Sequence, residues 1–81
     1  MNMAKRKGRF VICVNSGTYR VSLEPRKVYR VVPDPEAEAK SLLRVIDDSG
    51  EDYLFPARLF VPIEVPAKAQ PVFALEASTA R

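Results

Sequence analysis

The 81-residue chain has no histidine, no tryptophan and a single cysteine, Cys13. Without histidine it lacks the side chain that most often acts as a general base or binds a metal near neutral pH. One cysteine excludes an internal disulfide and every zinc site built from several thiolates. No Ser–His or Cys–His pair is available for nucleophilic catalysis. We therefore expect that the protein is not an enzyme and that it takes no cofactor, no metal and no small-molecule substrate.

The chain is too short for more than one domain, and it has no long hydrophobic run. Its first residues are basic, as in a signal peptide, but the apolar run at residues 10–14 ends after five residues, at Asn15-Ser16-Gly17. Such a run is too short for the core of a signal peptide or for a membrane span. We therefore expect a cytoplasmic protein with no membrane partner.

Alternation of apolar and polar residues is the dominant pattern, and enrichment in Val, Ile and Tyr favours strands over helix. Tyr19-Arg20-Val21-Ser22-Leu23 alternates at every position, which predicts a strand with Val21 in the core. The segments in which we expect strands are residues 10–14, 19–23, 27–32, 41–47, 52–55 and 60–63.

Two short helical signals interrupt this pattern. Asp34 suits the N-cap of a helix and Pro35 its first position, but the helical stretch, residues 34–40, has only seven residues. So short a stretch predicts a single turn inside a loop. Residues 56–59, Pro-Ala-Arg-Leu, predict a 3-10 turn before the last strand.

Residues 41–55 carry the clearest local signal, that of a β-hairpin. Asp47-Asp48-Ser49-Gly50 fits a type I turn followed by Gly50 in the left-handed region, where it forms a bulge. The resulting pairs are Val45 with Tyr53, Arg44 with Leu54 and Leu43 with Phe55. The inner, core-facing residues are then Leu43, Val45, Tyr53 and Phe55, and the outer ones are Leu42, Arg44, Ile46 and Leu54.

These elements predict an all-β fold: a small SH3-like barrel of about five short antiparallel strands with one helical or 3-10 turn, over residues 9–65. Residues 54–61, LFPARLFV, resemble the ending of SH3-like barrels, with an apolar pair, a proline, a turn, an aromatic residue and a valine. With residues 27–31 and 44–56, they resemble small bacterial and phage SH3-like barrel proteins of unassigned function. That resemblance implies the fold and no particular activity. The lack of tryptophan argues against recognition of proline-rich peptides.

Basic residues are concentrated at the start of the chain. Up to Lys27 there are seven basic residues and one acidic residue, whereas the remainder has six basic and nine acidic residues. A basic N-terminal arm at residues 1–8 can contact phosphates, and it can equally serve as a solvated tail. The candidate nucleic-acid contacts are Lys5, Arg6, Lys7, Arg9 and Arg20. A small barrel that binds nucleic acid is therefore an alternative function.

An apolar patch on the outer face of the hairpin gives the leading hypothesis. Leu42, Ile46 and Leu54 form this patch, which calls for a cover. The cover is the Pro/Ala-rich C-terminal tail at residues 66–81 with its apolar Val72, Phe73 and Leu75, or a second copy of the chain, or another protein. Edge strands of a small sheet invite the same partners. We therefore expect a non-catalytic protein-interaction or accessory module.

Overall fold

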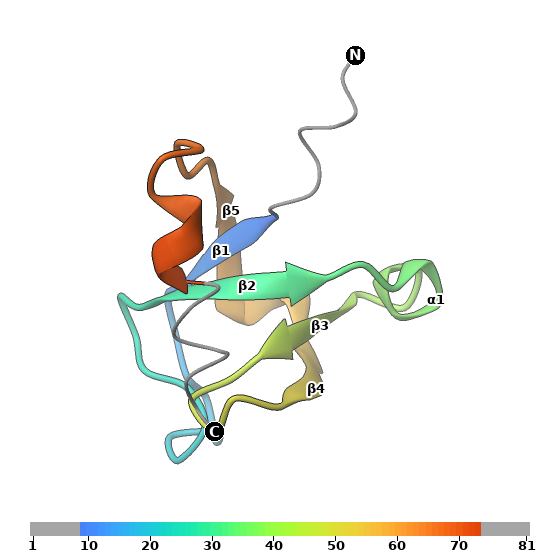
Figure 1. Ribbon diagram of the computed structural model, residues 1–81. Helices are drawn as coiled ribbons and strands as arrows, with labels where there is room; N and C mark the ends of the chain where they lie inside the picture. Colours follow the sequence, from blue (N-terminus) through green and yellow to red (C-terminus); the bar gives the residue numbers. More distant parts are fainter. Residues whose placement is uncertain (1–8, 74–81) are drawn as a thin grey trace.

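The computed structural model describes residues 9–73, which form one antiparallel sheet (Figure 1). Its strands are β1 (Phe10–Cys13), β2 (Val28–Val32), β3 (Leu42–Ile46), β4 (Asp52–Pro56) and β5 (Phe60–Ile63), in the order β4-β3-β2-β1-β5. The predicted all-β, five-stranded antiparallel architecture is confirmed. Within residues 9–73 the sheet ends at β4 and β5, which do not pair with each other, so the sheet is not closed into a barrel.

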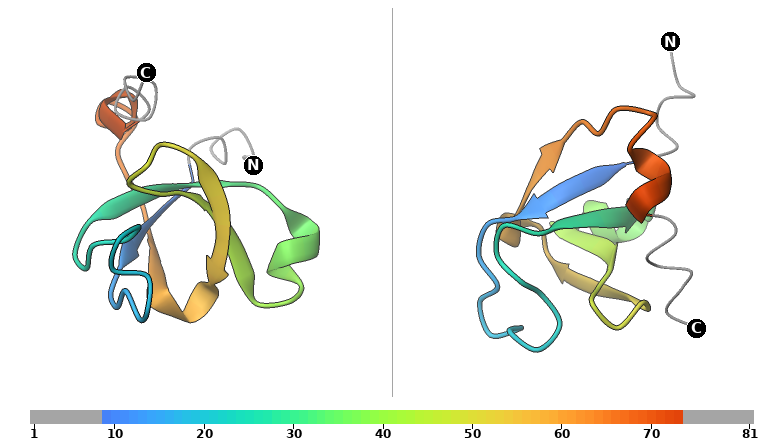
Figure 2. Two further views of the ribbon diagram at one scale, coloured as in Figure 1. Left: turned by 90° about the horizontal axis from the view of Figure 1, so that it is seen from below. Right: turned by 60° about the vertical axis from the view of Figure 1, so that its left-hand side comes forward.

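The sheet bends around its own core. Figure 2 shows β1 and β5 in one half and β3 and β4 in the other, with β2 crossing between the halves. The centroid of the Phe55 ring on β4 lies 6.3 Å from that of the Phe60 ring on β5. The two end strands, which share no backbone pairing, therefore contact each other through these side chains. The core residues are Val11, Cys13, Leu23, Tyr29, Val31, Val45, Phe55, Leu59 and Phe60.

The predicted hairpin is confirmed in register and in turn geometry. Leu43 pairs with Phe55, Arg44 with Leu54 and Val45 with Tyr53. The Asp47 N–H donates to the Glu51 carbonyl at 3.0 Å, the Gly50 N–H donates to the Asp47 carbonyl at 2.9 Å, and Gly50 has a φ of 88°. Glycine adopts this left-handed conformation without the clash that a Cβ causes.

The strand predicted at residues 19–23 is wrong. The N–H groups of Ser22 and Leu23 both donate to the Tyr19 carbonyl, at 2.9 and 2.8 Å, as in a tight helical turn. Val21 is 95% exposed, so its assignment to the core is also wrong, whereas Leu23 is buried. Strand β1 has β2 and β5 as neighbours, and β2 has β1 and β3, so neither strand next to this segment in the sequence has an open edge. The segment therefore folds as a loop between β1 and β2.

The predicted helical turn is confirmed as α1 (Pro35–Glu38). The Asp34 carboxylate accepts the Ala37 N–H at 3.1 Å and the Arg44 Nε–H at 2.9 Å. Both bonds hold the pKa of Asp34 below its usual range, and the bond from the Ala37 N–H has the larger effect. Asp34 thereby joins the cap of α1 to the outer face of β3.

The predicted 3-10 turn is confirmed as η2 (Ala57–Leu59), between β4 and β5. After β5 the chain turns back as a short helical segment at residues 70–73, in which the Phe73 ring lies 5.4 Å from the Phe10 ring on β1. The tail hypothesis placed Phe73 on Leu42, Ile46 and Leu54, whereas the ring contact that the structure shows for Phe73 is with Phe10. Leu75 and the basic arm at residues 1–8 lie outside the described residues.

Candidate functional site

The patch predicted on the outer face of the hairpin is brought together by the fold. Leu54 pairs with Arg44, so Leu42 and Ile46 are its diagonal neighbours on the same face. Leu54 is 40% exposed, and the other two are half-buried. Arg44 lies in the middle of this face, where its guanidinium binds Asp34 at 2.9 Å and Asp52 at 3.3 Å. The most accessible apolar residue of the patch is therefore the one on the end strand.

Tyr53, on the opposite face of β4, was expected in the core and is 50% exposed, so that expectation is wrong. It pairs with the fully buried Val45, but the loop between β1 and β2 covers the neighbouring Phe55 instead, through the Tyr19 ring at 5.2 Å. The Tyr53 hydroxyl donates to Glu51 Oε1 at 2.8 Å, and this bond raises the pKa of Tyr53. Strand β4 thus exposes apolar side chains on both of its faces.

The backbone of β4 also has unused hydrogen-bonding groups. The Asp47 N–H donates to the Glu51 carbonyl, so these two residues form a hydrogen-bonded pair. Hydrogen-bonded and non-hydrogen-bonded pairs alternate along an antiparallel ladder, so the N–H and C=O groups of Asp52 and Leu54 point away from β3. Pro56 fits the same alternation, because it stands at a position that needs no N–H toward β3. The edge of β4 therefore offers another strand two residues whose outward donors and acceptors have no partner in the described part of the chain.

The other end of the sheet is closed to such pairing. The Val14 N–H donates to the Leu59 carbonyl at 2.8 Å, and the same alternation directs Pro62 on β5 away from β1. Proline has no N–H to donate, so it blocks the outer edge of β5. The two ends of the sheet differ within residues 9–73: β4 keeps outward N–H groups at Asp52 and Leu54 and lacks one only at its last residue, Pro56, whereas Pro62 lies inside β5.

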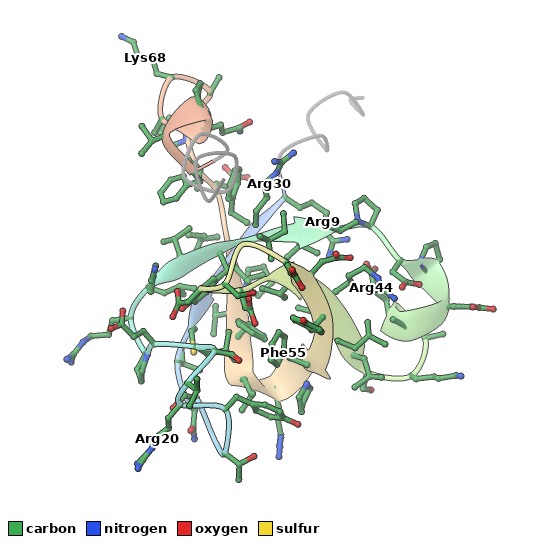
Figure 3. All side chains as sticks on the ribbon, turned by 60° about the horizontal axis from the view of Figure 1, so that its bottom comes forward. Arg9, Arg20, Arg30, Arg44, Phe55 and Lys68 are labelled. Carbon is green, nitrogen blue, oxygen red and sulfur yellow. The ribbon has the colours of Figure 1, made fainter. Side chains whose placement is uncertain are left out.

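The candidate nucleic-acid contacts are not brought together. Arg9 forms an ion pair with Glu38 at 2.9 Å, whereas Arg20 is exposed in the loop between β1 and β2. Figure 3 shows these two arginines on different sides of the molecule. The remaining candidates, Lys5, Arg6 and Lys7, lie outside the described residues. Within residues 9–73 the fold gathers no basic surface from this set.

Two side chains that could carry chemistry, Cys13 and Asp47, have structural roles in the fold. Cys13 is fully buried, and burial raises the pKa of its thiol. Asp47 accepts hydrogen bonds from the N–H and the hydroxyl of Ser49, at 2.8 and 2.6 Å. In the described part of the chain, no three His, Cys, Asp or Glu side chains are grouped so that they could hold a metal ion.

Comparison with protein-family models, with curated proteins and with solved structures finds no match for this chain. Among the described residues, no helix has the length and hydrophobicity needed to cross a membrane. The function must therefore be inferred from the residues themselves, and the exposed edge at β4 is the feature with the most evident capacity to bind.

Proposed function

We propose that this chain is a non-catalytic protein-interaction or accessory module that binds its partner through the edge of β4. One observation carries the proposal: no group of residues 9–73 bonds to the outward backbone donors and acceptors of β4, and Tyr53 and Leu54 are exposed on its two faces. In peptide recognition by strand addition, backbone hydrogen bonds supply affinity and alternate side chains supply specificity. An unprotected edge of this kind is one that monomeric proteins usually avoid.

We also propose that the fold is of the SH3-like barrel type. The strand order β4-β3-β2-β1-β5, the long loop between β1 and β2, and the 3-10 turn η2 before the last strand support this. Small barrels of this kind host many unrelated functions, so the fold leaves the partner open.

The absence of enzymatic activity is part of the same proposal. Its support is the lack of histidine in the sequence and the burial of the only thiol, Cys13. A cytoplasmic location is proposed with it, because a single unpaired cysteine suits a reducing compartment.

Nucleic-acid binding stands as the alternative proposal. Its support is the basic sequence Lys5-Arg6-Lys7 together with the net charge of +3. The two candidate contacts that are described, Arg9 and Arg20, do not add to this support, because one is paired with Glu38 and the other lies apart from it.

A pull-down from native cell extract, with and without nuclease, tests the two proposals. The bait is the full chain, compared with Leu54→Glu at the β4 edge and with Val61→Glu on β5, where Val61 is similarly exposed at 46%. We expect the wild-type bait and the Val61→Glu bait to capture a partner protein, and the Leu54→Glu bait to lose it. Nuclease treatment should leave the captured protein unchanged. Material that disappears with nuclease, or that binds all three baits equally, contradicts the proposal.

A further inference from the structure

Opposite charges flank β4 along the chain, with Arg58 in the η2 turn that follows the strand. Glu51 and Asp52 stand at its start, and Arg58 follows its last residue by two positions. Arg58 is exposed and forms no ion pair among residues 9–73. An antiparallel partner with the same sequence therefore places the Arg58 end of each copy at the acidic hairpin-turn end of the other, at the level of Asp48, whereas a parallel partner places like charges together.

From this complementarity we infer that the partner strand is β4 of a second copy of the chain, paired antiparallel with Tyr53 opposite Tyr53. The inference rests on the proposed function and names its partner. In this register Leu54 of each copy lies opposite Asp52 of the other, so the residues whose backbone groups point away from β3 bond to one another. Every free donor and acceptor of Asp52 and Leu54 is then used.

Side chains fit the same register. Tyr53 and Tyr53 of the second copy form a non-hydrogen-bonded pair, the type of antiparallel pair in which side chains lie closest together. Each Tyr53 ring is half-exposed in the single chain. Aromatic cross-strand pairs stabilise antiparallel sheets. On the outer face, each Leu54 extends the apolar surface formed with Leu42 and Ile46 across the junction.

The contact is small. A single pair of short strands lies at the low end of interface sizes, so we expect a dimer that dissociates at micromolar concentrations. Sedimentation equilibrium of the full chain, from about 10 μM to about 1 mM, covers this range. We expect a reversible monomer–dimer equilibrium for the wild type.

The sign of a charge at position 54 tests the register. Leu54→Glu places a carboxylate opposite Asp52 of the other copy, and we expect a dissociation constant at least about tenfold higher. Leu54→Lys places an amine there, and we expect a dissociation constant within about threefold of the wild type or lower. Loss of apolar contact alone would weaken both variants equally. Val61→Glu, on the blocked edge of β5, is the matched control and should dimerise as the wild type does.

A cysteine at position 53 provides a second readout in which the charge at position 54 is unchanged. Residues opposite each other without hydrogen bonds have a Cα separation compatible with a disulfide. Tyr53→Cys, oxidised with copper phenanthroline, should give covalent dimers at protein concentrations where Val61→Cys does not. Equal cross-linking of both variants overturns the inference.

A wild-type chain that stays monomeric up to about 1 mM also overturns the inference, as does equal weakening by Leu54→Glu and Leu54→Lys. The proposed function is judged separately, by the pull-down. A monomeric chain that captures another protein in a manner abolished by Leu54→Glu refutes self-pairing and supports β4 as a binding edge for that protein.

Discussion

The phenol of Tyr29 on β2 donates a hydrogen bond to Asp48 Oδ1, in the turn of the β3–β4 hairpin, at 3.0 Å. The same phenol oxygen accepts the Glu24 N–H at 2.8 Å, and Lys27 Nζ lies 2.6 Å from Asp48 Oδ1. Tyr29 is 4% exposed. One buried hydroxyl group therefore bonds both to the loop between β1 and β2 and to the hairpin whose second strand is the proposed binding edge, beside the hydrogen bond from the Asp48 N–H to the Ser22 carbonyl at 3.1 Å.

Removal of this hydroxyl should destabilise the fold. Tyr29→Phe leaves the Glu24 N–H without its acceptor and leaves Asp48 Oδ1 with Lys27 but without the phenol, so we expect a loss of about 1–2 kcal/mol in the free energy of unfolding. The matched control is Tyr53→Phe, which removes an exposed hydroxyl and should change stability by less than about 0.5 kcal/mol. Urea denaturation measures both, and equal effects of the two substitutions would show that Tyr29 is no anchor.

Stability should also depend on pH through Tyr29. Burial raises the pKa of its phenol, and the Asp48 carboxylate adds to that increase, although the Glu24 N–H acts against it. Because the pKa is higher in the folded state, the stabilisation is complete below the usual tyrosine pKa of about 10 and is lost as pH rises above it. Denaturation midpoints between about pH 8 and pH 11 should fall for the wild type and fall less for Tyr29→Phe. An identical alkaline decline in the two proteins would contradict this assignment.

The hairpin turn depends on the conformation of Gly50, whose φ of 88° strains residues with a Cβ. Gly50→Val should lower stability by about 1–3 kcal/mol, since a β-branched residue fits this region worst. Gly50→Asn should cost less, because asparagine adopts left-handed conformations more readily. Thermal melts compare the two, and a silent Gly50→Val variant would mean that the turn can form in another way.

The core should distinguish two residues that the sequence pattern treats alike. Phe55 is 3% exposed and contacts the rings of Tyr19 and Phe60, so Phe55→Ala should cost about 3–5 kcal/mol, enough to unfold so small a domain. Val21→Ala should change stability by less than about 0.5 kcal/mol, because this side chain lies in solvent. Circular dichroism during denaturation reports both, and a folded Phe55→Ala variant with an unchanged midpoint would refute the assigned core.

The sequence predicted best where local rules and tertiary structure agree. The hairpin register follows from Gly50 and the alternation on either side of it, and the α1 turn follows from Asp34 as cap and Pro35 as first residue. Both signals are contained within a few consecutive residues. No distant part of the chain had to be known for them to be correct.

The sequence-based predictions were wrong where the structure depends on which strands or loops are available to pair with or cover a segment. Residues 19–23 alternate as a strand does, but β1 and β2 pair with each other and leave no edge for this segment. Tyr53 has the spacing of a core residue, yet the covering loop packs on Phe55 and leaves Tyr53 half-exposed. The unprotected edge at β4 depends on strand order, which period-2 alternation does not encode.

Amide hydrogen exchange at Leu54 and Asp52, followed by NMR in the full chain at increasing protein concentration, tests most directly whether β4 binds another strand through its backbone. The amides of Tyr53 and Phe55, which the ladder directs toward β3, are internal controls. The account predicts that protection of Leu54 and Asp52 rises with concentration while that of Tyr53 and Phe55 stays constant. Leu54 and Asp52 amides that exchange at the same fast rate at every concentration would contradict pairing of β4 with a second copy of the chain.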